Sequence, residues 1–425
     1  MGFTAKKVRG MRDVLPPESE KWIYIQKVMG DSASFFGFMS VRTPIAEFTE
    51  LFCRSAGETS DVVQKEMYTF EDKGGRSLSL RPECTAGTLR AVIENESSLI
   101  FPVKLMYFGP CFRYEKPQSG RQREFFQFGL EIFGGSSVMA DFEIIRTADY
   151  IFKKLGINDI ILEINSMGCE DCRKNYRNSI LNFFNEKVNK LCKICQERIN
   201  KNPLRILDCK EKTCQEICSE APSIVDFICN NCKEQFEELK SYLEITEIKY
   251  KVNAHIVRGL DYYTKTVFEF TINTNGYDLT VCGGGRYDGL SKKMGGQDLA
   301  ATGFAIGIER VISIMEEQRI EFPKLKSRGL YIVCLNKESK ICAVKIAEEL
   351  RESGISVDLN LTEQSIKSQA KFADKMGYRY LLILGENEIN KGVCNVKRMS
   401  DGIEFEIAID DNFCDNFINK CECIL

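Results

Sequence analysis

The sequence predicts an α+β domain built on an antiparallel sheet, interrupted by a helical insertion and followed by a smaller α/β domain. Two apolar strand patterns, at residues 104–115 and 124–134, are joined by a loop rich in turn-forming residues, as in a hairpin. Between about residues 168 and 245 the strand patterns stop, and charged helical patterns and cysteines take their place. After residue 328, strand and helix patterns alternate, which is typical of a largely parallel sheet.

The first element is expected to be an amphipathic helix that begins after Pro16-Pro17, because proline fits the first turn of a helix. The further elements expected in the first domain, in chain order, are a short strand at 38–44, a helix at 83–96, the two hairpin strands, a helix at 138–155, strands at 159–165, 251–260, 266–272 and 277–285, and a strand that turns directly into a helix at 303–318.

The second domain is expected to hold strands at 329–335, 355–361 and 380–385, separated by helices that end near Ser353 and Met376. We therefore expect residues 1–325 to form the first domain, with the insertion at about 168–245, and residues 328–425 to form the second.

The insertion carries cysteine pairs at the spacing of a metal site. These are Cys169-x-x-Cys172, Cys192-x-x-Cys195 and Cys229-x-x-Cys232, with Cys209, Cys214 and Cys218 between them. Paired CxxC spacing is what a tetrahedral thiolate zinc site requires. The alternative is a helical module with reduced thiols. The sequence leaves both interpretations open and assigns no metal ligand.

Composition excludes several classes of protein. No apolar stretch approaches the roughly 20 residues that span a bilayer, and the first residues lack the apolar core of a signal peptide, so a cytoplasmic protein without membrane contact is expected. The formal net charge of −3 argues against a general polyanion-coating protein but permits a local basic patch. With His255 as the one histidine, catalytic triads and Cys/His dyads are implausible; His255 itself is expected on a strand.

Three arginines stand in settings that suit phosphate chemistry. Arg113 ends a strand in CFRYE, Arg258 lies in IVRGLDYY, and Arg310 opens a helix in GFAIGIERV. The planar guanidinium binds phosphate oxygens in bidentate fashion and keeps its charge. These positions are therefore candidates for holding a polyphosphate.

The order and spacing of the motifs resemble the histidyl-tRNA synthetase family over essentially the whole chain. FRYE…REFF resembles motif 2 of the class II aminoacyl-tRNA synthetases, GFAIGIER resembles motif 3, and the helix and strand ending in Arg42-Thr43-Pro44 resemble motif 1. RGLDYYT and GGGRYDGL are similar to the histidyl members in particular. The resemblance implies a class II catalytic domain and a C-terminal anticodon-binding domain, with ATP-dependent activation of histidine and its transfer to tRNA.

The resemblance also implies site residues. It gives Arg113 and Arg258 as catalytic residues near the α-phosphate. The implied ATP-binding residues are Arg113, Glu115, Phe125, Arg258 and Arg310; the implied histidine-binding residues are Glu83, Thr85, Gln127, Glu131, Tyr262 and Tyr263; and the implied contacts to the tRNA acceptor end are Gln118, Arg121 and Arg123. Mg²⁺ is expected to accompany ATP, and no protein metal ligand is implied.

The implied partners are ATP, L-histidine and its tRNA, together with a second copy of the chain, because motif 1 builds a two-fold interface in this class. Two alternatives to a histidyl-tRNA synthetase function stay open. A non-catalytic, synthetase-like regulatory subunit of histidine biosynthesis is expected to lack the C-terminal domain and to have eroded motifs. A synthetase for another amino acid is disfavoured by RGLDYY and Glu131.

Overall fold

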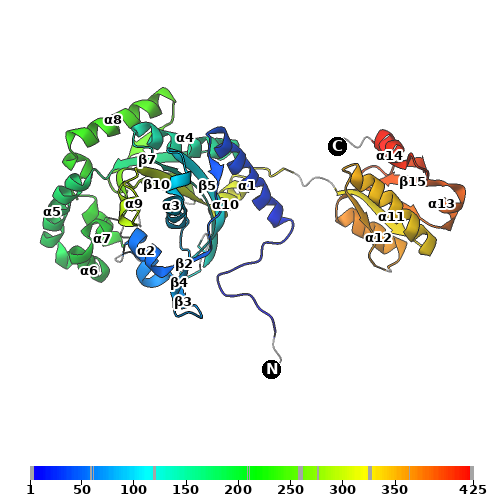
Figure 1. Cartoon of the computed structure of the whole chain (residues 1–425), viewed down its shortest axis with the longest axis horizontal. Coiled ribbons are helices and arrows are strands. Elements are labelled where there is room, and N and C mark those ends of the chain that lie inside the picture. The colour runs from blue at the N-terminus through cyan, green and yellow to red at the C-terminus, as the bar shows by residue number, and fades with distance from the viewer. Residues whose placement is uncertain are drawn as a thin grey trace. The chain divides into compact units, whose positions relative to one another are not determined.

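The chain divides into two compact units, Met1–Phe322 and Pro323–Leu425, which are drawn in Figure 1. The computed structural model describes residues 4–57, 60, 62–117, 121–207, 209, 211–256, 262–274, 277–323, 328–362 and 364–421. Among these residues, no helix combines the length and the apolar character needed to cross a membrane.

Eight strands of the described ranges form the main sheet of the N-terminal unit, and its pairings are antiparallel except at the two edges. In sheet order they are β1 (Met39–Ser40), β5 (Val103–Phe112), β6 (Glu124–Phe133), β11 (Ala301–Gly307), β10 (Tyr277–Arg286), β9 (Thr264–Thr274), β7 (Ile160–Ser166) and β8 (Tyr250–Val252). The hairpin between β5 and β6 is present, and the predicted antiparallel α+β class is confirmed.

One face of this sheet is covered by helices that share its core. They are α1 (Glu18–Phe35), α4 (Val138–Lys154), α10 (Ile308–Glu317) and the insertion helix α8 (Asn230–Ile245). Phe128, Leu130 and Ile132 contribute to this core from β6 and are at most 2% exposed. Burying each such side chain stabilises the fold by about 1.5–3 kcal/mol. The predicted direct turn from strand to helix is confirmed, since β11 ends at Gly307 and α10 begins at Ile308.

The opposite face of the sheet carries smaller elements. They are α2 (Thr49–Ala56), α3 (Thr85–Glu94), α9 (Leu290–Lys293) and a second sheet of β2 (Ala46–Phe48), β4 (Ser77–Leu80) and β3 (Tyr68–Glu71). The sequence reading did not include this small sheet. Because alternate residues of a strand face opposite sides, Gln127 and Glu131 of β6 are turned toward these elements and away from the apolar core.

The insertion is helical, and Figure 1 shows its helices grouped at one end of the N-terminal unit. They are α5 (Glu170–Glu186), α6 (Lys193–Lys201), α7 (Lys212–Cys218) and α8. The side chains of Tyr176, Ile180 and Phe184 on α5 are at most 1% exposed and pack in the core of the insertion. One strand prediction next to it was wrong: His255 lies in an exposed turn after β8, where its backbone N–H donates to Asn253 Oδ1 (3.0 Å).

The C-terminal unit is an α/β domain with a five-stranded sheet in its described residues. The order is β13 (Val357–Leu359), β12 (Arg328–Cys334), β14 (Tyr378–Leu384), β15 (Val393–Arg398), β16 (Glu404–Ala408), and the helices are α11 (Lys337–Glu352), α12 (Ile366–Lys375), α13 (Glu386–Lys391) and α14 (Phe413–Cys421). The expected largely parallel sheet was only half right, because β14–β15 and β15–β16 pair antiparallel. The short helix α13 connects β14 to β15, and a turn at 399–403 connects β15 to β16. Both connections are shorter than the crossover of about a dozen residues that a parallel neighbour needs.

Candidate active site

Two adjoining cavities of the N-terminal unit share the lining residues Arg113, Gln127, Gly283 and Ala305. Strands β6, β10 and β11 contribute lining residues to both cavities. The smaller cavity brings together all six side chains that the sequence implied for histidine: Glu83, Thr85, Gln127, Glu131, Tyr262 and Tyr263. The larger cavity brings together four of the residues implied for ATP: Arg113, Glu115, Phe125 and Arg310.

Glu131 lies at the bottom of the smaller cavity, where its side chain is 1% exposed. Its Oε1 accepts a hydrogen bond from Thr85 Oγ1 (2.7 Å) and one from the Tyr107 hydroxyl (3.2 Å), and its Oε2 accepts one from the Tyr287 hydroxyl (2.6 Å). Burial raises the pKa of Glu131 to about 8, against the lowering effect of these hydroxyl donors. The ligand-free pocket therefore holds a largely protonated acid at neutral pH.

This raised pKa predicts how Glu131→Gln changes stability. Between pH 4.5 and about 8 the folded state retains a proton that the unfolded state has lost. The free energy of unfolding therefore falls as pH rises through this window, and the loss is complete above the folded pKa. Glutamine removes the ionisation, so urea unfolding should show the ligand-free variant gaining about 1–4 kcal/mol on wild type between pH 5 and pH 8. An unchanged difference at the two pH values would contradict the protonated acid.

Glu83 and Thr85 meet at the start of helix α3. Glu83 accepts hydrogen bonds from the backbone N–H groups of Thr85 (2.5 Å) and Ala86 (2.8 Å). Burial raises the pKa of Glu83, whereas the two amides and the charge of Arg113 oppose that rise. A carboxylate at a helix N-terminus is favoured by the helix dipole, so the local structure fixes this acid at the wall of the pocket.

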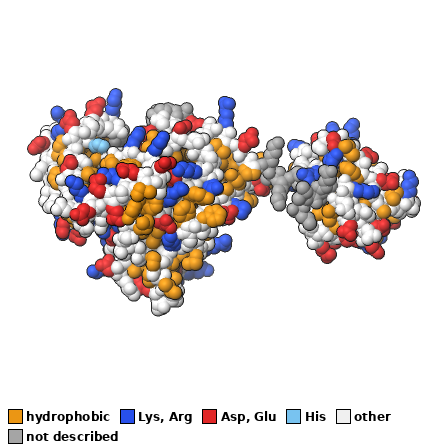
Figure 2. Space-filling model, turned by 90° about the horizontal axis from the view of Figure 1, so that it is seen from above, with side chains coloured by type: hydrophobic (Ala, Val, Ile, Leu, Met, Phe, Trp, Pro, Cys, Tyr) orange, Lys and Arg blue, Asp and Glu red, His pale blue; other side chains and the backbone are white. Residues whose placement is uncertain are grey.

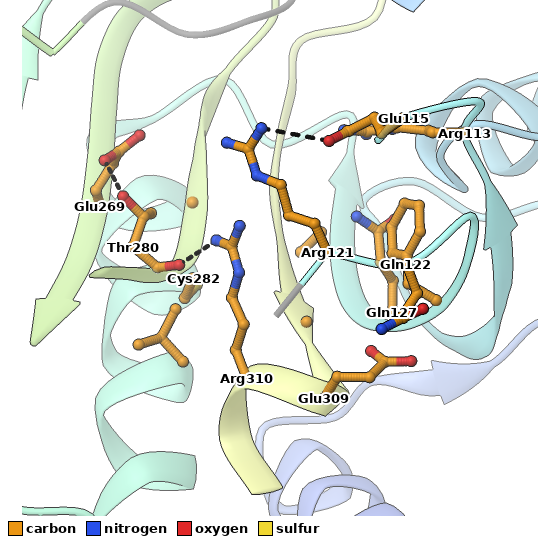
Figure 3. Close-up of a pocket in the computed structure, with 15 residues that line it drawn as sticks. Arg113, Glu115, Arg121, Gln122, Gln127, Glu269, Thr280, Cys282, Glu309 and Arg310 are labelled. Carbon is orange, nitrogen blue, oxygen red and sulfur yellow. Dashed lines mark hydrogen bonds and ion pairs between the residues drawn. The ribbon is translucent and has the colours of Figure 1, made fainter. Parts of the chain in front are cut away.

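The larger cavity is lined by three arginines, Arg113, Arg121 and Arg310, and by three glutamates, Glu115, Glu269 and Glu309. Burial lowers the pKa of Arg310, and the neighbouring guanidinium groups of Arg121 and Arg113 lower it further. Figure 3 shows Arg121 and Arg310 pointing into the same space, between the strand that carries Thr280 and the loop that carries Glu115. Arg310 donates to the carbonyl oxygen of Thr280. Crowded, desolvated cations are stabilised by an anion, so this cavity suits a polyphosphate.

The three residues implied for the tRNA acceptor end differ in placement. Arg121 lines the larger cavity and forms an ion pair with Glu115 (3.3 Å). The guanidinium of Arg123 lies over the Tyr114 ring, 3.8 Å from its centroid, instead of among the lining residues. Gln118 and the implied catalytic Arg258 both lie outside the described residues.

The sequence reading missed Tyr107 and Tyr287, the two tyrosines that hold Glu131. Tyr287 belongs to GGGRYDGL, which marked the family resemblance but received no role. The preceding Arg286 is 2% exposed and pairs with Asp141 (Nε–Oδ2 3.0 Å), which fixes the end of β10. Burial and the charge of Glu131 raise the pKa of Tyr287, so its hydroxyl remains a donor.

Two glycines make room for this arrangement. A Cβ on Gly303, the β11 neighbour of Glu131, would lie 1.7 Å from Glu131 Oε2. A Cβ on Gly129 would lie 2.2 Å from the Tyr107 ring. Real Cβ atoms do not approach so closely, so these backbones must lack side chains for the acid and the tyrosine to meet in the pocket.

The insertion cysteines form two sets in the structure. Cys169, Cys172, Cys229 and Cys232 make one set, and Cys192, Cys195, Cys209 and Cys214 make the other. Cys218 stays outside both and donates to the carbonyl oxygen of Ile206 (3.3 Å). Each set has the four sulfur atoms that a tetrahedral metal ion needs.

Comparison with known proteins agrees with this geometry. Residues 10–311 match the model of the histidyl-tRNA synthetase family, and residues 330–413 match that of an anticodon binding domain. The chain is 47% identical to a histidine–tRNA ligase of Clostridium botulinum over 407 residues, 95% of this chain and 96% of that protein. It is 46% identical to the histidine–tRNA ligase of Clostridium novyi over 404 residues, with the same coverage.

A solved structure supports the same assignment. The apo histidyl-tRNA synthetase of S. aureus superimposes with a TM-score of 0.82 at 35% identity, covering 97% of this chain and 100% of that one. The family model spans most of the chain, and both named relatives cover nearly all of it. The chain therefore belongs to the histidyl-tRNA synthetase family.

Proposed function

We propose that the protein is a histidine–tRNA ligase that activates L-histidine with ATP and transfers the histidyl group to the 3′ end of its tRNA in the cytoplasm. One observation carries the proposal: the buried acid Glu131 closes a small cavity that adjoins the arginine-lined cavity through Arg113. Such a pair of cavities suits a small polar ligand next to a polyphosphate. The test is charging of unfractionated bacterial tRNA with labelled histidine, for which labelled tRNA is expected.

The smaller cavity suits the imidazole ring. A ring nitrogen that carries hydrogen donates to a carboxylate, whereas a bare ring nitrogen accepts from a hydroxyl. Glu131 supplies the first partner, and Tyr262 or Tyr263 supplies the second. We assign Glu83, Thr85 and Gln127 to the α-ammonium side of histidine, and all three line the same cavity as Arg113.

In the first step the carboxylate of histidine attacks the α-phosphate of ATP, which forms histidyl-adenylate and releases pyrophosphate. Arg113 contacts both the carboxylate and the α-phosphate, since it lines both cavities. Arg310 takes the γ-phosphate, Phe125 stacks on adenine beside Glu115, and Arg258 supports the α-phosphate. No protein nucleophile is needed, because position and fixed positive charge lower the barrier.

Two metals are part of the proposal. Mg²⁺ would enter with ATP, and the carboxylates of Glu115, Glu269 and Glu309 in the larger cavity would offer it the oxygen ligands that it prefers. Zinc is the ion proposed for the insertion cysteines, where it would stabilise the folded insertion.

In the second step a ribose hydroxyl of the tRNA attacks the carbonyl carbon of the adenylate, which forms the histidyl ester and releases AMP. We assign contact with the tRNA acceptor end to Gln118, Arg121 and Arg123. We place the boundary between the catalytic and the C-terminal domain between residues 325 and 328, so that the domains span 1–325 and 328–425, and we assign anticodon binding to the second. A cavity in the C-terminal unit supports this role, because it is lined by Arg328 and by the exposed ring of Phe372. Unpaired RNA bases stack on aromatic rings and guanidinium planes.

The regulatory-subunit alternative is not favoured. The chain keeps the C-terminal domain that such a subunit is expected to lack, and its named relatives are histidine–tRNA ligases. Four of the five residues implied for ATP and all six implied for histidine also line the two cavities.

A homodimer is also proposed. The motif 1 region exposes large apolar side chains, with Phe35 76%, Met39 60% and Phe48 55% exposed. Figure 2 shows apolar side chains gathered on one face of the N-terminal unit. Such patches mark interaction surfaces in soluble proteins. Light scattering at micromolar concentration should give twice the chain mass, and an active protein with the mass of one chain would contradict the dimer.

A further inference from the structure

The sulfur atoms of each cysteine set are spaced as if around one ion. All four lie within 4.8 Å of one another in both sets. The Sγ atoms are 3.4 Å apart for Cys169 and Cys172, and 3.9 Å apart for Cys192 and Cys209. A tetrahedral zinc ion with Zn–S bonds of about 2.3 Å places its sulfurs about 3.8 Å apart, whereas a disulfide needs about 2.05 Å.

The backbone around the two sets favours thiolates. Cys169, Cys192 and Cys229 each occupy the position just before a helix, at the N-terminus of α5, α6 and α8. The N–H of Cys229 donates to Cys172 Sγ (3.1 Å), and the N–H of Cys192 donates to Cys214 Sγ (3.3 Å). Helix N-termini and N–H donors stabilise negative sulfur, which a metal ion requires as ligand.

We propose that the insertion binds two zinc ions, one in each cysteine set, and that the ion at the base of the insertion also positions the histidine pocket. The set Cys169, Cys172, Cys229, Cys232 is called the hinge cluster, and the set Cys192, Cys195, Cys209, Cys214 the inner cluster. The second half of the inference rests on the proposed function; the first half does not.

The hinge cluster joins the two ends of the insertion. Cys169 follows the end of β7 by three residues. Cys229 immediately precedes α8, which leads back to β8, the parallel neighbour of β7. Gly168 allows the backbone at the end of the β7 segment to lie close to Cys172, because it has φ +62° and a Cβ there would lie 2.4 Å from the Cβ of Cys172. An ion at this point therefore closes the insertion onto the main sheet.

The residues next to the hinge cluster, Gly168 and Arg173, are hydrogen-bonded to the segment 263–265. The carbonyl oxygen of Gly168 accepts from Lys265 N (2.9 Å). Arg173, the residue after Cys172, donates from Nη1 to the carbonyl oxygen of Tyr263 (3.0 Å). Tyr263 lines the histidine cavity. Losing the hinge ion should therefore loosen the histidine pocket, whereas losing the inner ion should loosen only the helices that surround it.

Metal analysis tests the two ions. Full-length protein from zinc-containing medium, purified anaerobically with reductant and washed with chelator, should hold two equivalents of zinc. Cys229→Ser/Cys232→Ser and Cys209→Ser/Cys214→Ser should each hold one, and the matched control Cys218→Ser, a buried cysteine outside both sets, should hold two. Fewer than two equivalents in the wild type, or iron in place of zinc, overturns the proposal. If the double variants do not fold, cobalt(II) binding to the wild type with the same stoichiometry decides it.

Histidine-dependent ATP–pyrophosphate exchange tests the link to the pocket. The hinge variant should raise KM for histidine about tenfold, as expected for losing a positioning hydrogen bond, with KM for ATP within about twofold. Arg173→Ala should share this defect while keeping two zinc ions, and the inner variant should keep both KM values. Equal KM values in all variants overturn the link. A wild type with two zinc ions and no exchange would instead refute the proposed function.

Discussion

Replacing Arg113 by alanine is expected to slow histidyl-adenylate formation by on the order of 10²–10³-fold, the usual cost of losing one preorganised group that stabilises developing charge. Arg113 lines both cavities, its Nε is fixed by the carbonyl oxygen of Pro82 (2.9 Å), and its guanidinium lies 5.2 Å from the centroid of the Phe125 ring. The variant should fold, because these contacts line a cavity and do not fill a core. Single-turnover quench with saturating ATP and histidine measures the rate.

Two further variants are compared with Arg113→Ala in this experiment. Arg113→Lys should recover only part of the rate, since an ammonium group cannot reproduce the guanidinium fork. Arg54→Ala, at a surface arginine of α2 with 58% of its side chain exposed, is the matched control and should behave like wild type. An Arg113→Ala rate within threefold of wild type would mean that Arg113 supports structure alone.

Replacing Glu131 by alanine is expected to lower kcat/KM for histidine between tenfold and several hundredfold, with ATP binding little changed. A hydrogen bond to a charged partner contributes about 1.5–3 kcal/mol. Glu131 is a buried acid of the smaller cavity, protonated when the cavity is empty, and it provides that charge once a ring N–H of histidine takes the place of its own proton. The variant also leaves the hydroxyls of Thr85, Tyr107 and Tyr287 without the acceptor that they share. Steady-state exchange at varied histidine measures the loss.

The same variant should narrow the preference for histidine over analogues that lack a ring nitrogen. A site built to hydrogen-bond a polar group rejects a ligand without it, because buried partners are then left unpaired. Glu131→Gln, which keeps the size of the side chain, should recover more activity than alanine. If the activity with histidine and the activity with the analogues fall equally, Glu131 supports the fold and does not recognise the imidazole ring.

Much of the site could be predicted because its signals are local. Alternation along β6 separates Gln127 and Glu131 from Phe128 and Leu130, and the structure places the two pairs on opposite faces of the sheet. The direct connection from β11 to α10 could likewise be predicted, because one continuous stretch of sequence contains both elements. It places Arg310 in the first turn of the helix.

The other parts of the site could not be predicted, because they depend on contacts between residues far apart in the sequence, which no local pattern encodes. Tyr107 reaches Glu131 through the register of β5 on β6, and Tyr287 reaches it from a position 156 residues away. The hinge cluster likewise joins the first CxxC pair to the third and passes over the second. A spacing specifies what a pair of cysteines can bind, but folding decides which pairs meet.

The central claim is that this pair of cavities activates histidine, and amino-acid-dependent ATP–pyrophosphate exchange tests it most directly. The purified full-length protein is assayed with ATP, Mg²⁺ and labelled pyrophosphate against each of the twenty amino acids in turn. We predict exchange with histidine alone. Exchange with another amino acid in place of histidine, or none with any of the twenty, would contradict the account.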